Sequence, residues 1–405
     1  MSHERSSSLS RRAVVGAALS GAVVAATAGP ARAATPRPAA RPSGGPVPGP
    51  VPPAAAVPPL NVPALRAALA DLEHPRLTSA QLRVSGSAGR WYGTAGVADR
   101  AEGHAVRARD TFRIGSITKV FVATVVLQLV AERRIGPAEP VQRHLPGLLP
   151  AEFPPVTVLQ LLNHTSGLPD EQGVPDLSTP EAVARHRYDR WTPRRIVATL
   201  PPGPMKFAPG TAQEYRGINY VLLALLIERL TGRRYGEVIG SRILRPLGLR
   251  HTSVPGDDPR IHGPHVHGYL AMTDGSLLDI TEFNQSEAWG EGEMISNTGD
   301  LDRFVTALFA GELLPPHVLQ RMFTLPPDEV RMLDGSPARY GAGLQTVTMN
   351  GITFWGKTGE RYGYASAMVA TRDQQRRAVL SFTPVRRDTT QQQVTMRVAE
   401  ALTRA

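Results

Sequence analysis

Residues 112–121 read Phe-Arg-Ile-Gly-Ser-Ile-Thr-Lys-Val-Phe, and an apolar run continues from them to about Glu132. The pattern predicts a short strand or turn that leads into a helix opened by Ser116. Lys119 follows three residues later, so both polar side chains lie on one face of that helix. The rest of the helix is apolar on every side, which is typical of a buried helix rather than an amphipathic one.

This Ser-x-x-Lys pair needs a chemical explanation, because an unpaired ammonium group is costly among apolar side chains. A serine hydroxyl becomes a good nucleophile when a base takes its proton, and a lysine of lowered pKa can be that base. Arginine cannot replace it, because arginine stays protonated in proteins. Only three of the 45 basic residues are lysines, namely Lys119, Lys206 and Lys357. The alternative is that Ser116 merely begins the helix and that Lys119 extends along its apolar surface to solvent.

Composition limits the class of protein. A chain of 405 residues with 41% hydrophobic residues can bury a large core and form more than one lobe. Its formal charge of +10 is dispersed without a lysine or arginine run, so we expect a solvated basic surface and no nucleic-acid partner. The absence of cysteine excludes disulfides, thiol nucleophiles and cysteine-ligated zinc.

Residues 1–33 have the pattern of an export signal. Arg11 and Arg12 form a twin-arginine motif, an apolar region covers 13–26, and small residues precede an expected cleavage site after Ala33. The alternative is a membrane anchor, but the apolar region is short and rich in glycine and alanine. We therefore expect a secreted, extracellular protein that has no membrane span after signal removal.

The remainder divides into a linker and one domain. Residues 34–60 are rich in proline and alanine, so they predict an extended linker that cannot form a core. Residues 61–405 predict the folded domain, with strands near both of its ends and helices between them. The predicted strands cover 82–86, 91–97, 343–348, 352–355, 365–371 and 378–382. The predicted helices cover 63–72, 116–132, 156–162, 219–230, 301–309 and 390–403.

This order of elements indicates an α/β (α+β) fold. Strands from both ends of the domain would build one sheet, and a helical lobe would be inserted in the middle of the chain. A second motif lies about 240 residues after Ser116, where the sequence Trp-Gly-Lys-Thr-Gly at 355–359 is expected to end a strand. Lys-Thr-Gly is a weak signal by itself. Together with Ser-x-x-Lys it forms the pair typical of serine β-lactamases and penicillin-binding proteins.

From about residue 65 to 400 the chain resembles the class C β-lactamase and serine D-alanyl-D-alanine carboxypeptidase family. Further similarities lie at 162–168, 207–211, Asn219-Tyr220 and Gly363-Tyr364. The resemblance implies a β-lactamase/transpeptidase-like fold, with an antiparallel sheet flanked by helices and the active site between the sheet and the inserted helical lobe.

The resemblance also implies roles for the catalytic residues. Ser116 would be the acylated nucleophile, and Lys119 would share its proton and help to activate it. Tyr215 falls where the family has the tyrosine of a Tyr-x-Asn motif, so it would relay protons to the leaving group and later activate water. The alternative for Tyr215 is a packed tyrosine with only local hydrogen bonds.

The second motif would bind the substrate. Lys357 and Thr358, followed by Gly359, would hold an anionic substrate carboxylate and polarise the tyrosine. The backbone N–H groups of Ser116 and Glu360 would form the oxyanion hole, which stabilises the tetrahedral intermediate.

The sequence departs from the family pattern at Gly217. In the family an asparagine at this place hydrogen-bonds the acyl side of the substrate and neighbours the catalytic lysine. Asn219 cannot replace it, because it lies four residues after Tyr215 and begins a helix. The glycine would open space beside Tyr215 for a bulkier acyl group, and the nearby positive charge of Arg216 would favour an acidic one. The departure leaves specificity for peptides, β-lactams or esters open.

Three histidines, His262, His265 and His267, form a possible metal cluster. They lie on an irregular loop that contains glycine and proline, so we expect surface histidines and no metal site. No metal or organic cofactor is expected for the predicted chemistry.

Three functions are compatible with these residues. The first is an exported serine hydrolase that acts through an acyl-enzyme, most like a D-alanyl-D-alanine carboxypeptidase. The second is an esterase or β-lactamase on the same fold, and the third is a non-catalytic protein that binds penicillin or cell-wall peptide. The expected partner is a small peptide, ester or β-lactam substrate, with cell-wall peptide among the candidates. The protein is expected to be a monomer.

Overall fold

The computed structural model describes residues 57–404. The predicted twin-arginine signal, its cleavage site and nearly all of the predicted linker lie outside the described residues. Helix α1 (Val62–Ala70) is the first regular element of this part, and the side chain of Asn61 caps it by accepting a hydrogen bond from Ala64 N at 3.0 Å.

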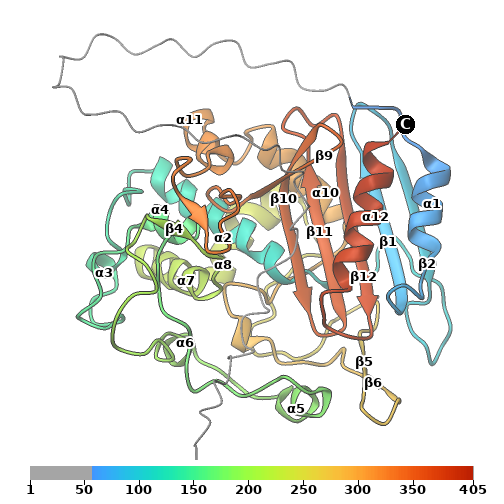
Figure 1. Ribbon diagram of the computed structural model, residues 1–405, viewed down its shortest axis with the longest axis horizontal. Coiled ribbons are helices and arrows are strands. Elements are labelled where there is room, and N and C mark those ends of the chain that lie inside the picture. The colour runs from blue at the N-terminus through green and yellow to red at the C-terminus, as the bar shows by residue number, and fades with distance from the viewer. Residues whose placement is uncertain (1–56, 405) are drawn as a thin grey trace, which may run out of the picture. The chain divides into compact units, whose positions relative to one another are not determined.

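A six-stranded antiparallel sheet forms one side of the described domain (Figure 1). Its strand order is β2-β1-β12-β11-β10-β9. The strands are β1 (Leu77–Ser85), β2 (Trp91–Gly96), β9 (Gln345–Met349), β10 (Ile352–Arg361), β11 (Tyr364–Ala370) and β12 (Arg377–Pro384). Because β1 pairs with β12, strands from the two ends of the domain lie side by side. The structure thus confirms a sheet built from both ends of the domain.

The two faces of this sheet are covered by different helices. Helices α1 and α12 (Gln391–Thr403) pack together on one face, where Leu82 and Phe382 join a small apolar core with Val398. The opposite face carries Val379 and Met368, which belong to the main core with the inserted helices. Side chains at neighbouring positions of a strand thus point to opposite faces of the sheet, and both faces are buried.

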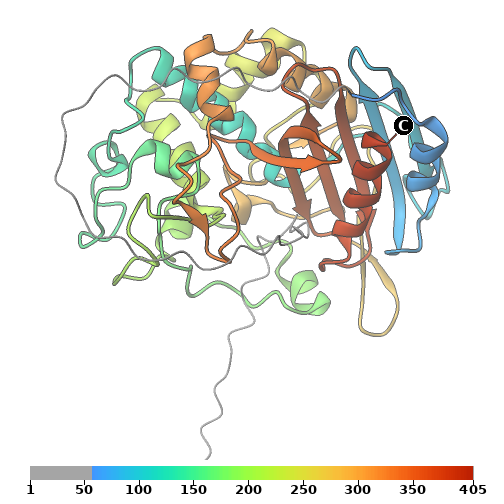
Figure 2. The same cartoon turned by 45° about the horizontal axis from the view of Figure 1, so that its top comes forward.

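The inserted segment between β2 and β9 forms a helical lobe beside the sheet (Figures 1 and 2). Its helices are α2 (Thr118–Ala131), α3 (Val141–His144), α4 (Val158–Leu162), α5 (Pro180–His186), α6 (Pro193–Val197), α7 (Ile218–Thr231), α8 (Tyr235–Ile239), α9 (Arg245–Leu247), α10 (Thr298–Phe309) and α11 (Pro316–Leu319). Short strands complete it: β3 (Phe112–Arg113), β4 (Ala212–Gln213), β5 (Tyr269–Ala271), β6 (Leu277–Asp279), β7 (Ile295–Ser296) and β8 (Arg331–Met332).

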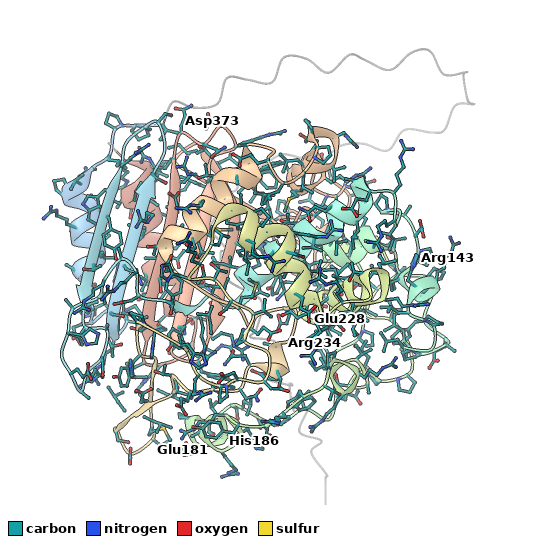
Figure 3. The ribbon with its side chains drawn as sticks, turned by 180° about the vertical axis from the view of Figure 1, so that it is seen from behind. Arg143, Glu181, His186, Glu228, Arg234 and Asp373 are labelled. Atoms are coloured by element: carbon teal, nitrogen blue, oxygen red, sulfur yellow. The ribbon has the colours of Figure 1, made fainter. Side chains whose placement is uncertain are left out.

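The view from behind separates the two sides of the domain. In Figure 3, Asp373 marks the turn between β11 and β12 on the sheet side, and Arg143 of α3 lies on the opposite, helical side. Among residues 57–404, no helix combines the length and apolar character that a membrane crossing requires.

Helix α2 has the buried environment that its sequence predicts. From residue 111 to 127, every residue except Ser116 is buried. The ring of Phe121 stacks on Phe304 of α10 with centroids 3.8 Å apart, which ties α2 to a helix that also packs on the sheet. Burial on all sides fixes the position of the first turn of α2, and therefore the positions of the polar groups at its start.

One predicted boundary is wrong. The 355–359 motif was expected to end a strand, but it lies inside β10, which continues to Arg361. The reason is pairing with β11, where Lys357 lies opposite Met368 and Arg361 opposite Tyr364. Cross-strand pairing rather than the local sequence determines the length of β10.

Candidate active site

Ser116 lies on a short 3-10 turn (Gly115–Ile117) between β3 and α2. This turn packs against β10 so closely that glycine is required. Gly115 has a φ of 51°, and a Cβ there would lie 2.4 Å from the backbone nitrogen of Glu360. The close approach brings the backbone of Glu360 next to the turn that carries Ser116, where the predicted oxyanion hole requires it.

Lys119 is fully buried one helical turn after Ser116. Its Nζ donates a hydrogen bond to Ser116 Oγ at 3.2 Å and another to the backbone oxygen of Glu291 at 2.8 Å. It also forms an ion pair with the Glu291 carboxylate. Burial lowers the pKa of Lys119, whereas the Glu291 carboxylate acts to raise it, and the net shift is downward. Lys119 is therefore placed and tuned to exchange a proton with Ser116.

Tyr215 approaches Ser116 from the segment between β4 and α7. Its hydroxyl donates a hydrogen bond to Ser116 Oγ at 2.7 Å. Its ring lies against His164, 4.6 Å between centroids, and against Tyr340 at 5.3 Å. Burial is the main reason that the pKa of Tyr215 is raised well above its usual value, and the Glu291 carboxylate adds to the shift. Tyr215 thus contacts the candidate nucleophile directly and is not limited to local hydrogen bonds.

The Trp-Gly-Lys-Thr-Gly motif at 355–359 lies on β10, beside the site. Lys357 is buried, and its Nζ donates to Gln345 Oε1 and to Thr358 O, both at 3.2 Å. The same ammonium lies 4.4 Å from the centroid of the Tyr215 ring. Burial, followed by repulsion from Lys119, lowers the pKa of Lys357 to about 7. Lys357 can therefore change its charge close to neutral pH.

The other residues of the motif have two kinds of environment. Thr358 and Glu360 are partly exposed, whereas Gly359 is buried against the first turn. A Cβ at Gly359 would lie 1.9 Å from the backbone oxygen of Ile114, so only glycine allows β10 to approach this closely. The structure therefore gathers all the predicted site residues around Ser116: Lys119, Tyr215, Lys357, Thr358, Gly359 and Glu360.

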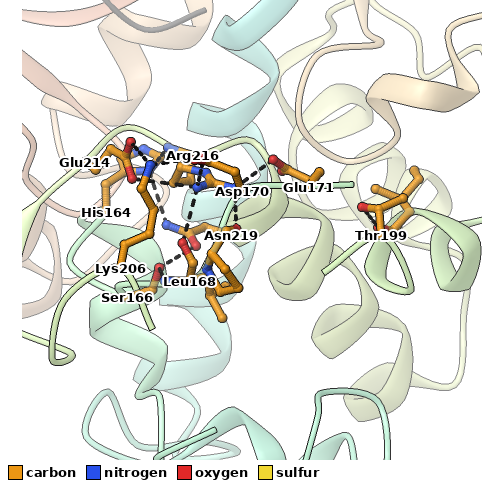
Figure 4. A network of polar contacts seen from close by, with 12 residues as sticks. His164, Ser166, Leu168, Asp170, Glu171, Thr199, Lys206, Glu214, Arg216 and Asn219 are labelled. Atoms are coloured by element: carbon orange, nitrogen blue, oxygen red, sulfur yellow. Dashed lines mark hydrogen bonds and ion pairs between the residues drawn. The ribbon is translucent and has the colours of Figure 1, made fainter. Parts of the chain in front are cut away.

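The expected effect of Arg216 on the substrate is wrong. Its side chain is only 7% exposed and is surrounded by acidic groups that pair with it (Figure 4). The guanidinium donates to Asp170 Oδ1 and Glu171 Oε2, both at 2.7 Å. Lys206 joins the same network through Asp170 and Glu214. Arg216 is thus neutralised by its neighbours, and it anchors the segment that carries Tyr215.

Buried polar groups hold the other side of this segment. The backbone N–H of Arg216 donates to His164 Nδ1 at 3.1 Å, and Ser166 Oγ donates to Asn219 Oδ1 at 2.8 Å. Burial is the main reason that the pKa of His164 lies well below its usual value, and Lys119 and Lys357 also lower it. A neutral His164 can accept the hydrogen bond from Arg216, which helps to fix the path of the chain from Tyr215 into α7.

Glu291 is the site residue that sequence reasoning missed. It lies in the loop between the 3-10 turn Ser286–Ala288 and β7, far from every motif in the sequence. Its carboxylate occupies the space beside Gly217, because a Cβ at position 217 would lie 2.9 Å from Glu291 Oε2. The glycine therefore does not leave the open space that we expected for a bulkier acyl group.

The three histidines of the expected surface loop have separate partners. His262 contacts Asp258 at 2.7 Å, His265 contacts the backbone oxygen of Gly263 at 2.7 Å, and His267 contacts Asp279 at 2.6 Å. Within residues 57–404, no group of three or more histidine, aspartate or glutamate side chains is arranged to hold a metal ion.

Comparison with known proteins identifies the family. The beta-lactamase family model matches residues 65–403, which include the sheet and all the site residues. The chain belongs to the β-lactamase family. The match confirms the predicted family and its β-lactamase/transpeptidase-like fold, in which an antiparallel sheet is flanked by helices. Members of this family are serine hydrolases that include penicillin-binding proteins, esterases and amidases.

Three similar proteins illustrate this range within the β-lactamase family. The solved D-stereospecific amidohydrolase from Streptomyces sp. is 34% identical, with a TM-score of 0.73 over 84% of this chain and 97% of that chain. Penicillin-binding protein 4* of Bacillus subtilis is 26% identical over 325 residues, or 75% of this chain and 67% of that protein. Esterase EstB of Burkholderia gladioli is 31% identical over 206 residues, or 46% of this chain and 50% of that protein.

Proposed function

We propose that this protein hydrolyses amide bonds of small acyl donors of D configuration, through an acyl-enzyme on Ser116. The observation that carries the proposal is the double contact of Ser116 Oγ, which accepts hydrogen bonds from both Lys119 and Tyr215. Two proton-carrying groups on one partly exposed hydroxyl are what a nucleophile of this kind requires. The D configuration is supported by the likeness to the D-stereospecific amidohydrolase.

The proposed reaction has two halves. In the first, the amine form of Lys119 takes the proton of the Ser116 hydroxyl while Oγ attacks the amide carbon. The N–H groups of Ser116 and Glu360 stabilise the oxyanion, and Tyr215 returns a proton to the departing amine as the C–N bond breaks. In the second half, a water molecule loses a proton to the same pair and attacks the ester carbon. The acid is then released, and the proton returns to Ser116 Oγ.

A D-alanyl-D-alanine carboxypeptidase is a narrower form of the same proposal. Its substrate is also an amide of a D-configured acyl group, but the leaving group carries a carboxylate. The buried ammonium of Lys357, next to Tyr215, is the group that favours such a leaving group. Simple esters are the second candidate substrates, supported by the likeness to EstB.

We also propose that the protein is exported, because residues 1–33 have a twin-arginine signal pattern. The test is to express the full chain with a wild-type or an Arg11→Lys/Arg12→Lys signal and to measure the exported fraction. Secretion that requires both arginines and a mature chain beginning at Ala34 would support the proposal. Retention of residues 1–33 would contradict it.

The central test combines mass spectrometry with kinetics. The protein is mixed with a β-lactam and, separately, with p-nitrophenyl acetate, and any adduct is mapped. We expect an increment on Ser116 and none in Ser116→Ala, with Ser166→Ala as the matched control that still reacts. Hydrolysis of D-alanine amide is then compared with L-alanine amide, a D-alanyl-D-alanine peptide and p-nitrophenyl acetate. No adduct from any donor, or an adduct on another residue, would refute the acyl-enzyme. Faster turnover of L-alanine amide would refute the D preference.

A further inference from the structure

Glu291 is the only anionic side chain that directly contacts Lys119 among the described residues. Lys119 is fully buried, whereas the side chain of Glu291 is 23% exposed. Glu291 is therefore the member of this ion pair that solvent, or a bound substrate, can reach. The carboxylate packs against Gly217, which has no side chain to displace it.

The position of Glu291 relative to Ser116 limits which substrate atoms can reach it. Lys119 Nζ bridges the two residues, since it bonds Ser116 Oγ at 3.2 Å and also the Glu291 carboxylate. In an α-aminoacyl group the nitrogen is only two bonds from the carbon that Ser116 attacks. An α-amino group can therefore lie within hydrogen-bonding distance of Glu291 while the acyl carbon is at Ser116.

The chemistry of Glu291 then determines which α-substituent is favourable. Burial opposes the charged carboxylate, but the Lys119 ammonium outweighs it and keeps the pKa of Glu291 below its usual value. An ionised carboxylate only accepts hydrogen bonds. An α-ammonium group offers donors and a positive charge, whereas an N-acyl group replaces the charge with a bulky amide whose oxygen is an acceptor.

The nearby charges strengthen this preference. Lys119 and Lys357 would repel an α-ammonium group if no anion were present, and the charge of Arg361 is already paired with Glu287. When an α-ammonium group shares the Glu291 carboxylate, Lys119 loses part of the support for its own positive charge. Lys119 then gives up a proton more easily, so a substrate of this kind also favours the base form of the lysine.

We propose that Glu291 selects acyl donors with a free α-ammonium group, so that α-aminoacyl amides are cleaved in preference to their N-acylated forms. This inference rests on the proposed function, because it assumes that Ser116 is acylated. It adds a substrate class, D-α-aminoacyl amides, and assigns the selection to a residue outside the family motifs.

The experiment compares D-alanine p-nitroanilide with N-acetyl-D-alanine p-nitroanilide. The readout is the ratio of the two kcat/KM values in wild type, Glu291→Gln and Glu287→Gln. Glu287 lies on the 3-10 turn that precedes the loop of Glu291 and pairs with Arg361, so Glu287→Gln removes one negative charge without touching Lys119. We expect wild type and Glu287→Gln to prefer the free amine at least tenfold. The ratio should fall toward one in Glu291→Gln.

Two further measurements keep the outcomes distinct. Acylation of Ser116 by p-nitrophenyl acetate tests the proposed function without any amine, so its absence would refute that function rather than the role of Glu291. The preference of wild type should also decline above about pH 8, where an α-amino group loses its charge. If Ser116 is acylated but wild type does not prefer the free amine, or if Glu291→Gln keeps the full preference, the inference is overturned.

Gly217→Ala is the second variant should Glu291→Gln fail to fold. Its Cβ would press on the Glu291 carboxylate, so it should lower the same ratio of kcat/KM values.

Discussion

The ammonium groups of Lys119 and Lys357 both lie over the ring of Tyr215, at 5.0 and 4.4 Å from its centroid. One lysine comes from α2 and the other from β10, so the tyrosine joins the helical lobe to the sheet. Both lysines are buried, and repulsion from Lys119 contributes to the lowered pKa of Lys357. The site therefore holds two ammonium groups against one aromatic ring, and the charge of Lys119 disfavours that of Lys357.

Replacing Lys119 with arginine should nearly abolish turnover. Arginine keeps the positive charge but cannot accept the Ser116 proton, and loss of a general base typically costs about 10²–10⁴-fold. The measurement is kcat/KM for D-alanine amide. The matched control is Lys206→Arg, because Lys206 forms ion pairs that arginine also forms. Activity of Lys119→Arg within a few-fold of wild type would show that the lysine acts only as a charge.

Removing the hydroxyl of Tyr215 should affect chemistry more than folding. Tyr215→Phe keeps the ring between His164 and Tyr340 but loses the 2.7 Å hydrogen bond to Ser116 Oγ. We expect kcat to fall about 10²–10⁴-fold, with a change in the free energy of unfolding of about 1 kcal/mol.

The control for this prediction is Tyr220→Phe. Its hydroxyl is buried and donates to Leu162 O at 2.9 Å, away from the nucleophile. This variant should lose about 0.5–1.5 kcal/mol of stability because one buried hydrogen bond is removed while Leu162 O still accepts from Gly343 N, and it should keep most of its activity. Equal effects of the two substitutions on kcat would argue that Tyr215 is only structural.

Substrates that end in a carboxylate should be cleaved best below neutral pH. The pKa of Lys357 is lowered to about 7 by burial and then by Lys119, so its ammonium form is lost as the pH rises through that value. The kcat/KM for D-alanyl-D-alanine should therefore decline above about pH 7 relative to its C-terminal amide. In Lys357→Arg, kcat/KM should depend on pH in the same way for the acid and for the amide, because arginine stays charged. Parallel pH profiles for the two wild-type substrates would mean that Lys357 does not bind the carboxylate.

Glu293 should make the protein more stable in mild acid than in mild base. It is fully buried, and it accepts hydrogen bonds from Tyr235 and from the backbone nitrogens of Gly290 and Gly256. Burial raises its pKa to about 7, above the value near 4.5 of an unfolded chain. Between these two pH values the folded state binds more protons than the unfolded state. The contribution of protonated Glu293 to the free energy of unfolding is therefore fully present below pH 4.5 and is lost as the pH rises through about 7.

The contribution of Glu293 to the free energy of unfolding is at most about 3–4 kcal/mol, since each unit of pKa shift corresponds to about 1.4 kcal/mol. The measurement is urea unfolding at pH 5 and pH 8 for wild type and Glu293→Gln. The variant should show a smaller loss of stability between the two pH values. An identical pH dependence in both proteins would contradict the assignment.

The sequence by itself determined the parts of the site that depend on short distances along the chain. Ser116 and Lys119 are three residues apart where a 3-10 turn continues directly into α2, so their contact follows from helical geometry and from the apolar residues around them. The alternation of apolar residues likewise predicted strands at both ends of the domain. Such features need no knowledge of the tertiary structure, because they depend on the local periodicity of the backbone.

Only the tertiary structure decided the electrostatics around these residues. Glu291 meets Lys119 because a loop 172 residues further along the chain packs against the start of α2. Arg216 offers no free charge to a substrate because Asp170 and Glu171, on another loop, neutralise it. The sequence around these three acidic residues does not reveal their roles, since charge pairs form between groups that folding brings together. A lysine motif can therefore be recognised in the sequence, whereas the acid that tunes it depends on how distant segments pack.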